Sequence, residues 1–237
     1  MTEPAPRPPK ARLLLFAFGD FAFNLYWQSL MLFLLFYYSD ALELPIRIAA
    51  TIFMIGSIWD GIANFIAGIL VDRRESTRGY GALIVVGAIP LGLTFTLTYL
   101  PPLGAGWGIA TVFAAHLLFR TAYAAVNVPY LAMSARISLN GSDRAFVAGI
   151  RMLFGTLAAV VVALGTVPLG EYLTGTRDPV RAFLAAAVTF AVIGAVILAA
   201  VGLTYRESAP PARPPAMSVR AALASLASNR AFVTLNL

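Results

Sequence analysis

Residues 48–71 read IAATIFMIGSIWDGIANFIAGILV, and Asp60, at the middle, is the one charged residue among them. An apolar run of about twenty residues is long enough to cross a bilayer as an α-helix. A carboxylate at the centre of such a helix costs roughly 2.5–3.5 kcal/mol on insertion scales, so it normally faces a protein or water-filled interior. Asp60 is therefore our first candidate for a functional residue.

Long apolar runs recur along the chain, and they predict an all-α integral membrane protein. Of the 237 residues, 59% are hydrophobic and only 12% are charged, which is more apolar than a soluble domain. The runs lack the alternation of barrel strands, and at about 1.5 Å per residue each can cross a hydrocarbon core of ~30 Å. We expect six transmembrane helices, at 13–38, 48–71, 82–100, 107–134, 145–170 and 182–204.

The positive charges indicate topology rather than nucleic-acid binding, although the net charge is +6. Most Lys and Arg residues outside the spans fall on the side of the two termini, and the opposite side receives only Arg47, Arg177 and Arg181. Cytoplasmic loops carry such an excess of positive charge. We therefore expect cytoplasmic N and C termini, a multi-pass protein of the cell (inner) membrane, and no nucleic-acid partner.

Composition also divides the segments outside the predicted bundle, 13–204. Residues 1–12 are rich in proline and predict a disordered cytoplasmic tail. Residues 205–217 hold four prolines and predict an extended cytoplasmic linker. Residues 218–237 predict an amphipathic helix followed by the start of a seventh apolar span.

Four of the six spans carry a single charge each, and the third and sixth spans carry none. Charged helices must face an interior, whereas a charge-free helix can face lipid. The pattern repeats after three spans, which indicates the 3+3 internal repeat that transporters use. The four charges, in chain order, are Asp20, Asp60, Arg120 and Arg151.

Helical rise converts these sequence positions into depths in the membrane. Asp60 and Arg120 should lie near the midplane, whereas Asp20 and Arg151 should lie roughly 10 Å from the cytoplasmic boundary. Two acid–base pairs at matched depths are therefore expected. Each pair could be a structural staple between helices or part of a functional site, and for Asp60 we favour function. Arg120 is read as the counter-ion of Asp60.

Polar residues next to these charges extend the candidate site. Asp60 and Asn64 are candidate cation-coupling residues on one helical face. We find no nucleophile–base set and no metal-ligand cluster, so the sequence predicts neither an enzyme nor a cofactor, and a Na⁺ site at Asp60 is only a weak candidate. His116 is read as a packing residue. The candidate substrate-binding residues are Asp20, Asn24, Trp27, Gln28, Arg120, Asn127 and Arg151.

Several short motifs resemble those of known transporters. The segment Gly68-Ile-Leu-Val-Asp72-Arg73, followed by Arg78, resembles the loop motif between helices 2 and 3 of the major facilitator superfamily. There the loop's charges lock contacts on the cytoplasmic side. The segments 19–24 (GDFAFN), 37–40 (YYSD), 59–60 (WD) and 127–130 (NVPY) are similar to the glycoside–pentoside–hexuronide:cation symporters, the melibiose permease-like branch. The resemblance extends from about residue 12 to residue 237.

The resemblance implies a secondary active transporter that moves a sugar- or glycoside-like solute by alternating access. In that family, Asp60 and Asn64 match the two sodium-binding carboxylates of the second helix, and Arg151 matches a sugar-binding arginine. Asn24 matches a sugar-binding aspartate of the first helix, and Asn127 matches an aspartate of the fourth helix. Because amides replace acids at three of these four acidic positions, coupling to H⁺, coupling to Na⁺ and uncoupled transport all stay open.

The resemblance also implies a partner for this bundle. Members of the family have two six-helix bundles with the ligand between them, and this sequence matches the N-terminal one. The expected partners are therefore a small-molecule solute, the lipid bilayer and a second six-helix half, either another copy or a missing C-terminal half. Two alternatives remain, a carrier of a lipid or other amphiphile and a non-transporting truncated half.

Overall fold

The computed structural model describes residues 8–73, 79–102 and 108–207, and these ranges contain helices and turns but no strand. The first helix, α1, comprises Lys10–Ser29 and continues through two π-helical turns, Leu30–Leu34 and Tyr37–Ala41. The remaining helices are α2 (Ile46–Asp72), α3 (Tyr80–Leu97), α4 (Gly108–Ser134), α5 (Gly141–Thr174) and α6 (Pro179–Thr204).

Several helices begin or end away from the predicted boundaries. Helix α5 spans 141–174 rather than 145–170, because the Asn140 side chain caps its start by accepting a hydrogen bond from Ser142 N at 2.9 Å. It ends at Gly175, whose φ of 65° is the left-handed conformation that glycine adopts easily. The predicted tail, 1–12, is also too long, since α1 already begins at Lys10.

The end of α3 differs from the predicted boundary, and the structure adds a contact for the segment after α6. Helix α3 ends at Leu97 rather than at 100, where a turn precedes two prolines. After α6, residues 205–207 leave the helix, and Glu207 forms an ion pair of 2.7 Å with Arg136 from the α4–α5 connection. The rest of the predicted linker, the amphipathic helix and the seventh span lie outside the described residues.

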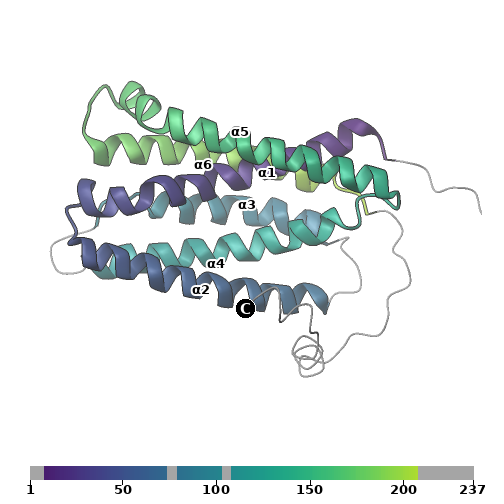
Figure 1. The fold of residues 1–237 in the computed structure, drawn as a ribbon, viewed down its shortest axis with the longest axis horizontal. Coiled ribbons are helices and arrows are strands. Elements are labelled where there is room, and N and C mark those ends of the chain that lie inside the picture. The colour runs from purple at the N-terminus through teal and green to yellow at the C-terminus, as the bar shows by residue number, and fades with distance from the viewer. Residues whose placement is uncertain (1–7, 74–78, 103–107, 208–237) are drawn as a thin grey trace, which may run out of the picture.

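The six helices run roughly parallel or antiparallel to one long axis (Figure 1). In that view α5 and α6 lie along one side, α1 and α3 lie in the middle, and α2 and α4 lie along the other side. Helices α3 and α6 approach closely because glycines face each other. A Cβ added at Gly81 would lie 2.6 Å from the carbonyl oxygen of Gly202, which leaves no room for a side chain at this crossing.

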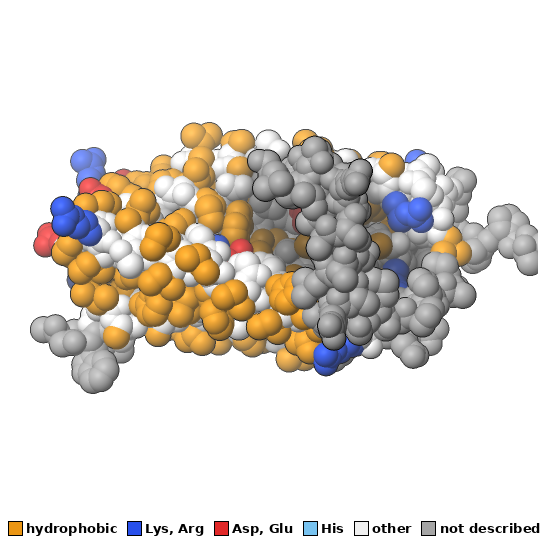
Figure 2. Space-filling view, turned by 60° about the horizontal axis from the view of Figure 1, so that its bottom comes forward, with side chains coloured by type: hydrophobic (Ala, Val, Ile, Leu, Met, Phe, Trp, Pro, Cys, Tyr) orange, Lys and Arg blue, Asp and Glu red, His pale blue; other side chains and the backbone are white. Residues whose placement is uncertain are grey.

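The outer surface of the bundle is strongly apolar. Val86, Leu164 and Leu203 expose between 73% and 76% of their surface, and Figure 2 shows hydrophobic side chains over most of the described face, with Lys and Arg near its two ends. Among the described residues, five helices, α2 to α6, are long and apolar enough to cross a membrane. Helix α1 is not among these five, so its crossing stays a prediction.

The helices differ in how much of their apolar surface the bundle covers. In α3, α4 and α6, 39% of the most apolar window is buried, compared with 17% in α2 and α5. The charge-free helices α3 and α6 pack against each other and keep outward apolar strips, which suits contact with lipid. We expected the charged helices to line an interior. Because α2 and α5 bury so little of their surface, the described residues do not fully cover that interior.

Candidate functional site

Asp20 on α1 and Arg151 on α5 form a closed, two-pronged ion pair. Arg151 Nε donates to Asp20 Oδ2 at 2.7 Å, and Arg151 Nη2 donates to Asp20 Oδ1 at 3.1 Å. This fork geometry is the strongest form of carboxylate–guanidinium contact. The guanidinium also lies 5.2 Å from the ring centre of Tyr130. The pair keeps 14–17% of its side-chain surface exposed, so a solute can reach it.

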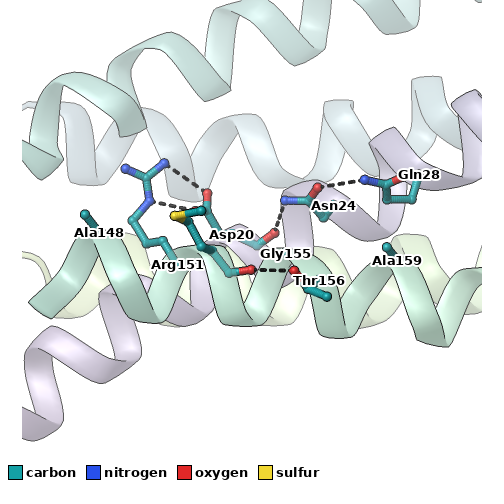
Figure 3. A pocket seen from close by; sticks show the side chains of 9 residues that line it. Asp20, Asn24, Gln28, Ala148, Arg151, Gly155, Thr156 and Ala159 are labelled. Carbon is teal, nitrogen blue, oxygen red and sulfur yellow. Dashed lines mark hydrogen bonds and ion pairs between the residues drawn. The ribbon is translucent and has the colours of Figure 1, made fainter.

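A cavity of about 590 Å³ lies beside this pair, between α1 and α5. Figure 3 shows Asp20 of α1 facing Arg151 of α5, with Asn24 and Gln28 following along α1. Small residues keep the space open, since a Cβ added at Gly155 would lie 3.1 Å from Asn24 Nδ2. The cavity is lined by Asp20, Asn24, Gln28, Ala148, Arg151, Met152, Gly155, Thr156 and Ala159.

The polar side chains of α1 form a short hydrogen-bonded chain that ends in the cavity. Asn24 Nδ2 donates to the carbonyl oxygen of Asp20 at 2.9 Å, and Gln28 Nε2 donates to Asn24 Oδ1 at 3.4 Å. Amides carry both donors and acceptors, and so do hydroxyl groups. The wall of the cavity can therefore bind a ligand that carries several hydroxyls.

Asp60 on α2 and Arg120 on α4 form a second, looser pair. Arg120 Nη1 lies 3.7 Å from Asp60 Oδ1, and the Arg120 side chain is only 1% exposed while that of Asp60 is 19% exposed. Neither Asp60 Oδ1 nor Arg120 Nη2 makes a hydrogen bond within the part of the chain that the structure describes. Both pairs that the depth argument predicts are thus found, but only one of them is closed by hydrogen bonds.

Aromatic and imidazole groups hold Arg120 in place. Its guanidinium carbon lies 5.0 Å from the ring centre of Trp27 and 5.7 Å from that of Phe53, within the range of cation–π attraction. Arg120 Nε contacts His116 Nε2 at 3.4 Å, and His116 Nδ1 lies 3.5 Å from the Tyr38 hydroxyl. His116, read from the sequence as a packing residue, is completely buried in this cluster.

The predicted substrate-binding residues therefore separate into groups. Asp20, Asn24, Gln28 and Arg151 line the cavity. Trp27 and Arg120 belong to the Asp60 cluster instead. Asn127 is half-buried on α4 and does not line this cavity.

Asn64 and the loop motif have more limited contacts. Asn64 Nδ2 donates to the carbonyl oxygen of Asp60 at 2.8 Å, one turn earlier on the same helix. Gly68 lies on α2 where an added Cβ would meet no described atom within 4 Å. Asp72 and Arg73 are exposed at the end of α2, and Arg78 lies outside the described residues. The conformational role of this motif stays a prediction.

Sequence reasoning missed several residues that shape the two sites. Gly155 and Thr156 lie one turn beyond Arg151, and the small glycine at that spacing was the available signal. Phe53 and Tyr38 join the Arg120 cluster from α2 and from the end of the first helical segment. Their spacing gave no signal, because the contacts depend on how three helices pack. Within the described ranges, no group of three Asp, Glu or His side chains comes together as a metal site.

Comparison with known families matches residues 15–237 to the model described as MFS/sugar transport protein. The chain belongs to this family. Because the match covers nearly the whole sequence and the structure supplies several long apolar helices, the chain is a multi-pass membrane protein. The resemblance to the major facilitator superfamily that the motifs indicate is confirmed.

Curated relatives of this family member carry symporter and transporter names. It is 31% identical to the "Uncharacterized symporter YnaJ" of Bacillus subtilis (68% of this chain, 35% of that protein). It is 26% identical to the "Inner membrane symporter YicJ" of Escherichia coli (83% and 43%) and 25% identical to the "Isoprimeverose transporter" of Lactiplantibacillus pentosus (81% and 41%). The chain thus spans about two fifths of the length of these relatives.

Proposed function

We propose that this chain forms one six-helix bundle of a secondary transporter that moves a sugar- or glycoside-like solute across the cell membrane by alternating access. The observation that carries the proposal is the polar cavity between α1 and α5. Its wall offers a carboxylate, a guanidinium, two amides and a hydroxyl within one space of about 590 Å³. The family match and the transporter names of its relatives support the same function.

The chemistry of the cavity favours a neutral solute with many hydroxyls. Asp20 and Arg151 neutralise each other, so a charged solute would leave an uncompensated charge in the membrane interior. Hydroxyl groups can accept from Arg151 and Asn24 and donate to Asp20, all of which line the cavity. This supports a polyol over the alternative, a lipid or other amphiphile.

The proposed topology has six crossings with both termini in the cytoplasm, arranged as a 3+3 repeat. It is supported by the apolar length of α2 to α6 and by the excess of Lys and Arg on the side of the termini. We propose that a second six-helix half covers the cavity, because its described lining comes from α1 and α5 alone and because α2 and α5 bury little apolar surface against the described residues. That half is either another copy of this bundle or a C-terminal bundle.

We also propose that Asp60 takes part in coupling to a cation, H⁺ or Na⁺. A carboxylate inside a membrane-spanning helix supports this role, because its charge is costly unless it is compensated. The prediction for Asp60→Asn is loss of uphill uptake in proteoliposomes while downhill exchange of solute continues. Undiminished uphill uptake by this variant would exclude the role.

The transport proposal is tested by uptake of a labelled methyl glycoside into proteoliposomes that contain the protein as purified from its native membrane. We expect saturable uptake that free sugars compete away and that amphiphiles such as lysophospholipids do not. Competition by amphiphiles alone would favour the alternative carrier. The absence of both uptake and solute-dependent thermal stabilisation would favour a non-transporting half.

A further inference from the structure

The Arg120 guanidinium is fixed in the membrane interior by groups from three helices. Trp27 of α1 and Phe53 of α2 lie against its charge, at 5.0 Å and 5.7 Å from ring centre to guanidinium carbon. His116, one turn earlier on α4, contacts its Nε. With 1% of its side chain exposed, Arg120 is buried by the described residues.

The packing of His116 against α2 helps to keep Arg120 in this position. His116 lies directly against the backbone of Gly56 on α2, where an added methyl group would overlap the imidazole ring. The imidazole is completely buried and also contacts the Tyr38 hydroxyl at 3.5 Å. Arg120 therefore contacts two aromatic rings and a histidine that packs directly against the α2 backbone.

We infer that Arg120 is the built-in cation of the Asp60 site, and that this site takes up no metal ion from solution. This inference rests on the proposed transport function. It adds to that function by naming an ion that does not accompany the solute. It assigns Arg120 to positioning and compensating the Asp60 carboxylate rather than to binding solute. Of the two coupling ions proposed above, the inference concerns Na⁺ alone, which it excludes.

Charge balance carries this step. One carboxylate faces one guanidinium at 3.7 Å, so the site is already neutral. A sodium ion beside Asp60 would add a net positive charge next to a fixed guanidinium, and in a medium of low dielectric constant such a charge is repelled strongly and is poorly solvated. The neighbouring Asn64 adds no negative charge, and its amide nitrogen already donates to the Asp60 carbonyl oxygen. The other intramembrane carboxylate, Asp20, is closed by Arg151.

The first test is thermal unfolding of the protein purified from its native membrane in mild detergent, in NaCl and in choline chloride at matched ionic strength. We expect the same melting temperature in both salts over the whole concentration range. A saturable rise with Na⁺ would overturn the inference, because a ligand that binds the folded state raises its stability. This readout needs no solute, so it remains decisive even if the transport proposal fails.

The second test is a double-mutant cycle on the pair. Asp60→Asn and Arg120→Gln should each lower the melting temperature, and the double variant should recover at least half of the larger loss. The matched control is the exposed pair Asp178 and Arg181, which lie 3.4 Å apart with 42% and 74% of their side chains exposed, and its cycle should show little coupling. Additive losses in the Asp60–Arg120 cycle would overturn the inference. If a single variant fails to fold, the sodium measurement on the unmodified protein still decides it.

Discussion

Two Asp–Arg pairs lie inside the same bundle, and they differ in almost every physical respect. The Asp20–Arg151 pair is closed by two hydrogen bonds, is partly exposed and forms the wall of a cavity. The Asp60–Arg120 pair is 3.7 Å apart, has a buried guanidinium and keeps unpaired polar atoms among the described residues. Identical residue types have therefore become part of a cavity wall in one place and a loose pair with a buried guanidinium in the other.

The difference teaches that surroundings decide the role of an intramembrane charge. Arg151 uses its fork on Asp20 and presents its remaining surface to the cavity, whereas Arg120 is held by aromatic rings and an imidazole. We therefore expect changes at the first pair to affect binding more than stability. Changes at the second pair should affect stability more than binding.

The largest expected effect is on the stability of an Asp60→Asn variant. Removing the carboxylate leaves the buried Arg120 guanidinium without a counter-charge, and breaking a buried pair in this way costs about 3–5 kcal/mol. Asp20→Asn should cost clearly less, because Arg151 is 17% exposed and can be solvated from the cavity. Thermal unfolding of both variants in detergent checks this order. Equal losses would break the contrast between the two pairs.

The next largest effect is expected when Arg151 or Arg120 is replaced by lysine. The first change should alter solute affinity, and the second should alter stability. Lysine cannot form the two-pronged contact, so Arg151→Lys should weaken solute affinity about tenfold or more, equivalent to about 1.4 kcal/mol, with little change in melting temperature. Arg120→Lys should instead lower the melting temperature, since the ammonium group stacks less well on aromatic rings. Titration calorimetry with a binding sugar and thermal unfolding measure the two quantities. Affinity loss in both variants alike would contradict the division of roles.

A smaller effect is expected from filling the cavity at Gly155. An added Cβ lies 3.1 Å from Asn24 Nδ2, so Gly155→Leu should obstruct the space beside the closed pair and weaken solute binding about tenfold. Gly165→Leu is the matched control, because a Cβ at this position on the same helix meets no described atom within 4 Å. Equal affinities for the two variants would show that the solute does not use this cavity.

The smallest effect concerns the ring that links α1 to the Asp60–Arg120 pair. Trp27→Leu removes the aromatic face 5.0 Å from the Arg120 guanidinium, and loss of a cation–π contact costs about 0.5–2 kcal/mol. The variant should melt slightly earlier than the unmodified protein. In an Arg120→Gln background the same change should cost less, and an identical cost in both backgrounds would show that Trp27 does not stabilise Arg120.

Much of the arrangement could be predicted from the sequence, because membrane helices obey simple constraints of length and charge. Matched depths along the helices predict that Asp20 pairs with Arg151 and Asp60 with Arg120, and the structure brings both pairs together. The family was predicted from short motifs and is confirmed over residues 15–237. These predictions rest on helical rise and on the cost of an unpaired charge in lipid.

The remaining features depend on packing, which periodicity does not report. Trp27 shares a helical face with Asp20 and was grouped with it, but the structure places its ring against Arg120. The capped start of α5 at Asn140 lies beyond the apolar run, so hydrophobicity alone placed this boundary too late. The small residue Gly155 opens the cavity only because α1 passes beside it.

The most direct test of the central claim is equilibrium binding of a labelled sugar to the protein purified from its native membrane, compared with its Asp20→Asn/Arg151→Gln variant. The double variant keeps the charge balance of the cavity wall but removes the closed pair. The account predicts a loss of affinity of tenfold or more, about 1.4 kcal/mol, at a nearly unchanged melting temperature. Unchanged affinity in the folded variant would contradict the assignment of the cavity between α1 and α5 as the solute site.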